Sequence, residues 1–169
     1  MEKNKIRESL ERGVAAYPVS NGILQFDLKT GILLECDHYV TRAVIPDRIK
    51  GVPVPAIIDG AFQDCTALRS VRIPRSVKAI NSYAFYRCFS LTDVFYDGTR
   101  EEFEANLLPK IDNRANDCFL NANFHFKRVL PGGLSVWEPT RRHAALILLA
   151  ALTLTALILG RGKDNSHSR

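Results

Sequence analysis

The apolar and polar positions in the middle of the chain repeat at an offset of 23 residues. Residues 61–68 return as residues 84–91 with Phe and Cys at matching places, and Ala56-Ile57 returns as Ala79-Ile80. In a repeat protein each turn buries its apolar face against the turns beside it. The pattern therefore predicts a stacked array that offers a binding surface rather than a pocket built for catalysis.

Each repeat combines a short strand with a turn that returns the chain to the stack. Val71 and Ile73 alternate with polar residues, which predicts a strand that points both side chains inward. Pro74 then ends the strand because it lacks a backbone donor. Phe62 and Phe85 occupy the same position in successive repeats, so we expect their rings to stack as the spine of the array.

The segments before the repeats predict a hairpin that covers the open first turn. Two apolar runs, residues 23–27 and 32–36, flank a short turn that contains Gly. A first repeat copy at residues 43–46 precedes residues 71–74 by 28 residues instead of 23. The extra residues fall within 47–54 and predict a small protruding turn.

The segments after the repeats predict a closing cap. Thr99 and Glu102 have the spacing of a capping box, which predicts the start of a helix. Phe103 and Leu107, four residues apart, would pack that helix over the last repeat. Residues 121–126 are typical of a final strand.

An uncharged run near the end of the chain predicts a transmembrane helix. Residues 144–160 are rich in Leu and Ile and are flanked by Arg. At about 1.5 Å per residue they would span about 26 Å, slightly less than a hydrocarbon core of roughly 30 Å. A buried core helix is the alternative, but the segment is apolar on all sides. The predicted organisation is an N-terminal helix and linker (1–20), a repeat domain (21–127), a linker (128–143), the transmembrane helix (144–160) and a basic tail (161–169).

The charge distribution bears on location and partners. Residues 1–12 are charged throughout and do not resemble a secretory signal, so we expect a cytoplasmic repeat domain, with cell-surface exposure as the alternative. Basic residues lie on both sides of residues 144–160 and leave the orientation open. The net charge of +5 arises mainly after Thr140. Composition therefore does not favour a nucleic-acid partner.

The cysteines fit the repeat better than they fit a disulfide framework. Cys65 and Cys88 are equivalent in successive repeats, which predicts small, buried, reduced side chains whose thiols donate to the loop backbone. A bridge between Cys65 and Cys88 in an oxidising compartment is the alternative.

Residues 71–91 fit the pattern V-x-I-P-x-S-V-x-x-I-x-x-x-A-F-x-x-C-x-x-L, and on these residues the chain resembles the BspA-type leucine-rich repeat family. The resemblance covers about residues 21–127, including an amino-terminal hairpin unit and a closing cap. It implies an α/β fold, a short leucine-rich repeat solenoid of about three turns. It also implies a non-enzymatic scaffold, often on bacterial cell surfaces, that is associated with adhesion or protein binding. The chain departs from that pattern by lacking a signal peptide and the wall-sorting motif L-P-x-T-G.

The exposed side of the strand layer is the candidate binding face. Arg72 beside Phe95 is a pairing that can anchor a protein partner, because Arg and aromatic residues are enriched in binding hot spots. The alternative is that Arg72 is solvated and Phe95 packs under the closing helix. The candidate residues lie in two rows, Arg42, Ser70 and Asp93 in one, and Val44, Arg72 and Phe95 in the next.

Other reactive side chains do not form the clusters that chemistry needs. Cys36, Asp37 and His38 lack a further ligand pair to complete a metal site. Cys118 and His125 lack a group that would orient a nucleophile and its base. We predict no catalytic residues, no metal, no cofactor and no small-molecule substrate.

The favoured function is therefore protein–protein interaction by a non-catalytic, membrane-tethered leucine-rich repeat protein. One alternative is a structural or regulatory membrane appendage that acts through its transmembrane helix, with the repeats as a spacer. A cell-surface adhesin is a further alternative if the repeats are exported.

Overall fold

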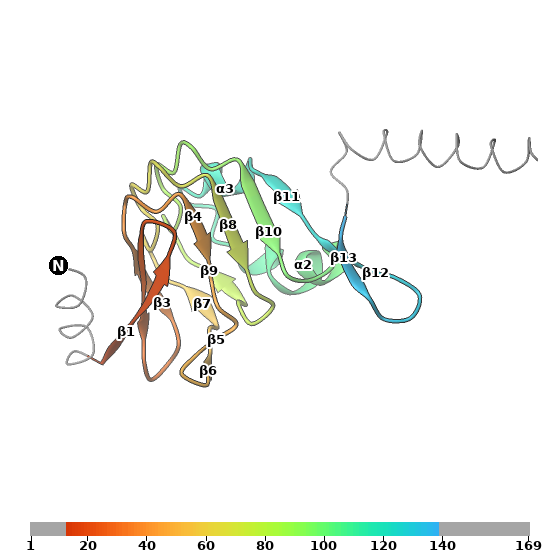
Figure 1. Ribbon diagram of the computed structural model, residues 1–169. Helices are drawn as coiled ribbons and strands as arrows, with labels where there is room; N and C mark the ends of the chain where they lie inside the picture. The colour runs from red at the N-terminus through yellow and green to blue at the C-terminus, as the bar shows by residue number, and fades with distance from the viewer. Residues whose placement is uncertain (1–12, 139–169) are drawn as a thin grey trace, which may run out of the picture. The chain divides into compact units, whose positions relative to one another are not determined.

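The computed structural model describes residues 13–138 (Figure 1). The predicted helix within residues 1–12 and the predicted transmembrane helix at 144–160 lie outside this range. Within residues 13–138, no helix has the length and apolar character needed to cross a membrane. The chain divides after Trp137, and all the described elements belong to the first of its two parts.

A parallel four-stranded sheet forms one side of this part of the chain, in the order β11-β10-β8-β4 (Figure 1). Its register follows the sequence repeat, because Ala43 pairs with Val71 and Val71 with Val94. The predicted final strand joins the same sheet beside β10. The strands are β4 (Arg42–Val44), β8 (Ser70–Ile73), β10 (Asp93–Tyr96) and β11 (Asn123–His125).

A mixed five-stranded sheet in the order β1-β2-β3-β7-β9 forms the other side. Its first three strands are antiparallel and its last pairings are parallel, with Ala56 against Ala79 as the 23-residue offset predicts. The predicted hairpin is confirmed as β2 and β3. The strands are β1 (Val14–Val19), β2 (Gly22–Asp27), β3 (Leu33–Cys36), β7 (Ala56–Ile57) and β9 (Ala79–Ile80).

Strand β1 was not anticipated, since residues 1–20 were expected to form a helix and a linker. It pairs with β2 along its whole length, and Pro18 is tolerated because β1 is the edge strand of its sheet. Residues 14–19 are therefore part of the amino-terminal cap rather than a connection to it.

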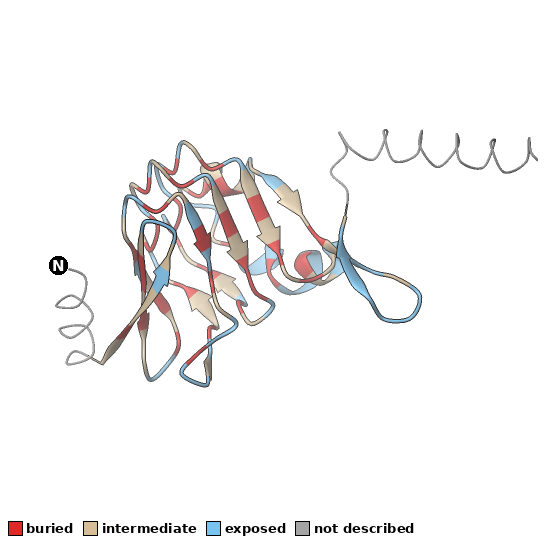
Figure 2. Ribbon diagram, viewed as in Figure 1, coloured by how far each residue is buried: buried red, intermediate tan, exposed pale blue. Residues whose placement is uncertain are grey.

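The core lies between the two sheets, because the chain passes from one to the other in each repeat. Figure 2 shows buried and half-buried residues alternating along the strands. The rings of Phe62 and Phe85 stack with centroids 4.8 Å apart, as predicted, and Phe119 continues the column at 4.6 Å from Phe85. All three rings are completely buried, so the spine runs one turn beyond the recognisable repeats.

Short elements close the remaining edges. The predicted protruding turn is the hairpin of β5 (Arg48–Ile49) and β6 (Val52–Pro53). The helix α2 (Arg100–Asn106) begins with the predicted capping box and buries Phe103. A 3-10 turn, η1 (Leu108–Lys110), and α3 (Asp117–Leu120) follow. A hairpin of β12 (Lys127–Val129) and β13 (Ser135–Trp137) occupies the region expected to begin the linker.

A buried side-chain amide closes the last turn of the stack. Between the two clear repeats, the Phe62 amide donates to the Ala84 carbonyl at 2.7 Å. One turn later the Phe85 amide donates to Oδ1 of Asn116 at 2.9 Å, and Nδ2 of Asn116 donates to the Asn81 carbonyl. Asn116 is completely buried. Its side chain thus takes the place of the backbone that a further repeat would supply.

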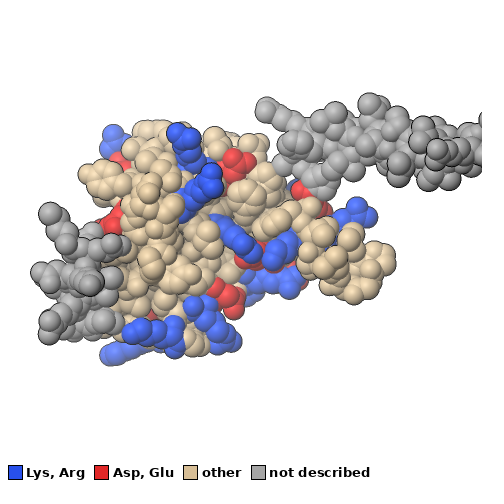
Figure 3. Space-filling model, in the orientation of Figure 1, with Lys and Arg blue, Asp and Glu red and all other residues tan. Residues whose placement is uncertain are grey.

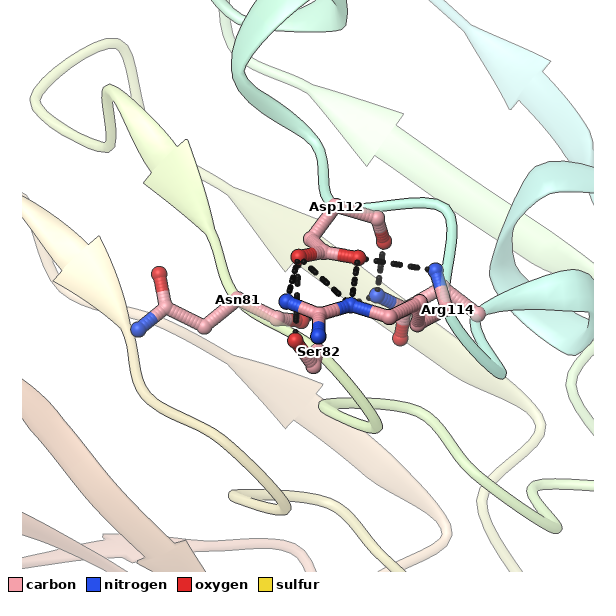
Figure 4. A network of polar contacts seen from close by, with 5 residues as sticks. Asn81, Ser82, Asp112 and Arg114 are labelled. Atoms are coloured by element: carbon pink, nitrogen blue, oxygen red, sulfur yellow. Dashed lines mark hydrogen bonds and ion pairs between the residues drawn. The ribbon is translucent and has the colours of Figure 1, made fainter.

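Asp112 holds the segment that carries this amide. Its carboxylate accepts hydrogen bonds from the Ser82 hydroxyl at 3.0 Å and from the Arg114 guanidinium at 2.7 Å (Figure 4). The Arg114 side chain is the main reason that the pKa of Asp112 lies well below its ordinary value. The carboxylate therefore stays charged and keeps both partners across the ordinary pH range.

We predict that Asn116→Ala destabilises the protein by about 2–4 kcal/mol, because a buried amide donor and a buried carbonyl lose their partners. The measurement is urea unfolding of the full chain followed by circular dichroism. Asn121→Ala, an exposed Asn a few residues away, is the matched control and should change stability by less than about 0.5 kcal/mol. Equal effects of the two substitutions would contradict the capping role.

Candidate functional site

The exposed side of the four-stranded sheet brings all five predicted site residues together. Arg42 pairs with Ser70 and Ser70 with Asp93 across neighbouring strands, and Arg72 pairs with Phe95 in the next exposed row. The predicted rows are therefore confirmed as a register, although no ligand tests the binding role. The five residues line one surface depression of about 540 Å³, and we call its lining the strand face: Arg42, Ala43, Val44, Arg69, Ser70, Arg72, Thr92, Asp93 and Phe95.

The strand face is strongly basic on its β4–β8 side. Arg42 and Arg69 are exposed, and in the described part of the chain neither guanidinium contacts a carboxylate. Figure 3, which views this side, shows Lys and Arg side chains gathered over β4 and β8. Sequence reasoning missed Arg69, which directly precedes β8. Its amide donates to the Thr41 carbonyl, so it belongs to a third row of equivalent positions.

Arg72 is held by an ion pair, in contrast to the free anchor that the sequence suggested. Its Nε and Nη2 donate to the Asp97 carboxylate at 3.0 and 2.7 Å, and Lys127 adds a contact of 2.9 Å. Burial raises the pKa of Asp97, but the hydrogen bonds from Arg72 and Lys127 outweigh it, so the pKa lies below its ordinary value. Arg72 therefore positions the strand ends while part of its guanidinium stays exposed.

Phe95 packs against neighbouring aromatic rings rather than under α2. Its ring stacks on His125 of β11 with centroids 4.4 Å apart, and the ring of Trp137 meets it edge-on at 5.4 Å. The Trp137 ring also lies 5.5 Å from the Arg72 guanidinium and 5.5 Å from Lys127 Nζ. The hairpin β12–β13 thus borders the strand face with the single Trp of the chain.

Asp93 is the only carboxylate among the residues that line the depression, and it already has partners. Its Oδ1 lies 2.7 Å from Nε2 of His125, and its Oδ2 accepts from the Thr92 hydroxyl at 2.8 Å. Burial raises the pKa of Asp93, but the hydrogen bonds from His125 and then Thr92 together lower it by more. The pKa of Asp93 therefore lies below its ordinary value. The local charge is therefore positive around Ser70.

The cysteines behave as structural thiols. All four lie in the described region and are free, which for Cys65 and Cys88 agrees with the prediction from the repeat pattern. The Cys88 thiol donates to the Phe62 carbonyl at 3.0 Å. Burial raises the pKa of Cys88. The pKa of Cys36 is raised mainly by the hydrogen-bond contact with Cys65, and burial raises it as well. Such thiols are poor nucleophiles.

The other clusters considered from sequence are not brought together as reactive sites. Asp37 accepts from the Ile23 amide at 3.1 Å, which gives it a role in the hairpin cap. Within the described part of the chain, His125 contacts Asp93 and Phe95, and no hydrogen bond joins it to Cys118. Within residues 13–138, no group of three or more His, Cys, Asp or Glu side chains has the arrangement to hold a metal ion.

Comparison with known families gives the fold a name. A family model described as "BspA type Leucine rich repeat region (6 copies)" matches residues 38–125. The chain belongs to the BspA-type leucine-rich repeat family. The resemblance drawn from residues 71–91 is thereby confirmed, and the described part of the chain has a leucine-rich repeat-like fold with mixed sheets.

Solved structures of bacterial leucine-rich repeat proteins are similar to parts of this BspA-type chain. A leucine rich cell surface protein from Faecalibacterium prausnitzii shares 29% identity with a TM-score of 0.39, over 48% of this chain and 23% of that one. A leucine-rich repeat protein of T. pallidum shares 23% with a TM-score of 0.36, over 52% and 41%. One from Bacteroides ovatus shares 21% with a TM-score of 0.36, over 48% and 23%.

The chain therefore spans less than half the length of each of these structures. A comparison with curated proteins gave no match.

We predict that Asp97→Asn lowers stability at neutral pH by about 1–2 kcal/mol, because Arg72 and Lys127 lose their charged partner. A carboxylate with a depressed pKa in the folded state contributes stability above its unfolded pKa and loses it as pH falls through the folded pKa. The difference between the two proteins should therefore narrow as pH falls from about 5 to about 2. Thermal unfolding followed by circular dichroism across that range measures it.

Asp47→Asn serves as the control, because Asp47 is exposed and its carboxylate has no ion pair in the described region. A difference between Asp97→Asn and the unchanged protein that stays constant with pH would contradict the electrostatic origin.

Proposed function

We propose that this chain is a non-catalytic, membrane-tethered leucine-rich repeat protein that binds a protein partner through its strand face. The observation that carries the proposal is that Arg42 and Arg69, which form no ion pair within residues 13–138, line one depression together with Phe95. Arg and aromatic side chains are enriched among residues that dominate binding energy. The exposed face of a stack of equivalent strands offers such residues in fixed rows.

The rigidity of the strand face supports this assignment. Each strand that carries it pairs with its neighbours in register, and Arg72 and Phe95 are fixed by Asp97 and His125. A preorganised surface loses little side-chain freedom on binding, which favours affinity for a given contact area. We propose that the repeats form a short solenoid of about three turns whose two caps keep this face in place.

The tether and the domain boundaries are parts of the same proposal. Residues 144–160 would form the transmembrane helix, after a repeat domain at 21–127 and a linker at 128–143, with a basic tail at 161–169. The uncharged run of Leu and Ile supports the tether. In this arrangement the repeat domain faces the cytoplasm, with neither a cofactor nor a small-molecule substrate.

A structural or regulatory membrane appendage is a second candidate, favoured by the same apolar run. In that case the partners would contact residues 144–160 and the repeats would act as a spacer. A cell-surface adhesin is the outcome if the repeats lie outside the membrane.

We predict that a photo-crosslinker placed at Ser70 in the full chain, in cells that express it, captures a defined protein. The same crosslinker placed at Lys78, which is exposed and does not line the depression, should not capture it. Arg42→Glu with Arg69→Glu should reduce the captured product at least about tenfold, since opposite charge at a hot spot costs several kcal/mol.

The matched control reverses the same amount of charge elsewhere, by Lys78→Glu with Lys110→Glu, both at exposed positions. It should leave the product unchanged. Identical products from Ser70 and Lys78, or equal losses from both charge reversals, would exclude the strand face. Sensitivity confined to residues 144–160 would favour the appendage.

We also predict that single cysteines at Ser135 and Ser168 differ in access to a membrane-impermeant thiol reagent. In intact cells Ser168→Cys should be labelled and Ser135→Cys should be labelled only after permeabilisation. Cys36, Cys65 and Cys88 are buried and should not react with the reagent. The experiment therefore needs only the replacement of the half-buried Cys118 and a measurement of background labelling in the protein without an added cysteine. Labelling of Ser135→Cys alone would place the repeats outside and support the adhesin.

Equal labelling of both sites in intact cells would contradict a single crossing. As an independent control, Leu152→Lys with Leu154→Lys should release the chain from the membrane fraction, because each charge costs roughly 2.5–3.5 kcal/mol at the helix centre.

A further inference from the structure

We infer that the strand face recognises an extended acidic segment of a protein partner, with an apolar residue next to the acidic ones. This inference rests on the proposed function and names the chemistry of the partner. It follows from which polar groups around Ser70 are free and which are already paired.

The polar groups around the depression that have no partner within residues 13–138 can donate hydrogen bonds, and most of them are positively charged. Within residues 13–138, Arg42 and Arg69 form no ion pair, and the Ser70 hydroxyl makes no hydrogen bond to the protein. The Arg72 guanidinium uses Nε and Nη2 for Asp97, and the whole side chain is 41% exposed. Asp93 would repel an anion, but its two oxygens already accept from His125 and Thr92.

The spacing suits an extended chain. Arg42 and Ser70 are direct partners on adjacent parallel strands, and Arg69 precedes Ser70, so both arginines are immediate neighbours of Ser70 and line the same depression. Alternate side chains of an extended peptide point the same way about 6.6–6.8 Å apart. Two carboxylates at alternate positions can therefore each meet one guanidinium, and Arg forks bind carboxylates in a bidentate manner.

The backbone of Arg42, at the edge of the sheet, is already occupied, which favours recognition by side chains. The Ser20 hydroxyl donates to the Arg42 carbonyl at 2.9 Å and accepts from the Arg42 amide at 3.0 Å. A peptide cannot add itself as a new strand beside Arg42 while Ser20 holds both groups. An acidic segment lying across the face meets no such obstacle.

The apolar part of the proposed ligand has a matching place in the next row. Val44 is 48% exposed and lies on β4, in register with Arg72 and in the same exposed row as Phe95. An apolar side chain next to the acidic residues would cover Val44, which Arg72 separates from Phe95, and would add burial to charge. A purely anionic ligand would leave this row uncovered.

The test measures binding of a fluorescein-labelled peptide that alternates Glu and Ala around a central Leu, by anisotropy, to the full chain in a neutral detergent. Its counterpart has Gln at every Glu position. We expect saturable binding of the Glu peptide only, at least about tenfold weaker after Arg42→Gln with Arg69→Gln and weakened by added salt. Binding should also change the fluorescence of Trp137, which contacts Arg72 and Phe95.

Lys78→Gln with Lys110→Gln is the matched control and should leave the affinity within about twofold, because surface charges far from a site are screened. Circular dichroism and the thermal midpoint of each variant exclude unfolding as the cause. Replacing the central Leu by Ala should weaken binding by less than the two Arg substitutions do.

Several results would overturn the inference. These are equal binding of the Glu and Gln peptides, no binding of either, equal losses in the Arg and Lys variants, or tight Arg42- and Arg69-dependent binding to anionic lipid vesicles without binding of the peptide. If the peptide fails while the crosslinker at Ser70 still captures a partner in an Arg-dependent manner, the proposed function stands and only the acidic chemistry is wrong. If both fail, the strand face is not a binding site.

Discussion

Each turn of this fold leaves backbone groups and an apolar edge that only a neighbouring turn can satisfy, and the rest of the structure depends on how the two ends are closed. At the amino-terminal end, β3 pairs with β7 in parallel, and β2 and β1 continue the sheet from β3 as antiparallel strands. At the other end, Asn116 presents an amide where a repeat would present backbone, and Phe119 completes the ring column. Few turns suffice because each end is closed by its own residues.

The same constraint arranges the surface. Parallel pairing in register places equivalent positions side by side, so exposed residues form rows across the strands. Along these rows the character changes from free guanidiniums at Arg42 and Arg69 to an aromatic group around Phe95. The gradient follows the order of the repeats in the chain, so each repeat contributes one column of the face.

The sequence was enough to predict the features that recur with the period or depend on near neighbours. The offset of 23 residues gave the pairing of Ala56 with Ala79, and local spacing gave the capping box of Thr99 and Glu102. Features that occur only once in the chain had no periodic or local signal of this kind. The pairing of Arg72 with Asp97 crosses between repeats, and β1 holds its place only through pairing with β2. In the sequence, Asn116 looks like a loop residue, because its side chain has three hydrogen-bond partners that are backbone groups, most of them distant along the chain.

The hydrogen bonds of Ser20 to the Arg42 backbone affect how selective the strand face can be. Because Ser20 occupies the backbone of Arg42, a ligand gains no main-chain hydrogen bonds at that position and is held there by side-chain charge and apolar contact. Charge of this kind speeds encounter more than it fixes sequence, so many acidic segments would approach with similar rates. Discrimination would then come from Val44 and Phe95, which lie on either side of Arg72 in the next row, and the rings of His125 and Trp137 keep Phe95 in one position. A partner would therefore be selected by the residue beside its acidic groups, while the guanidiniums determine how readily it arrives.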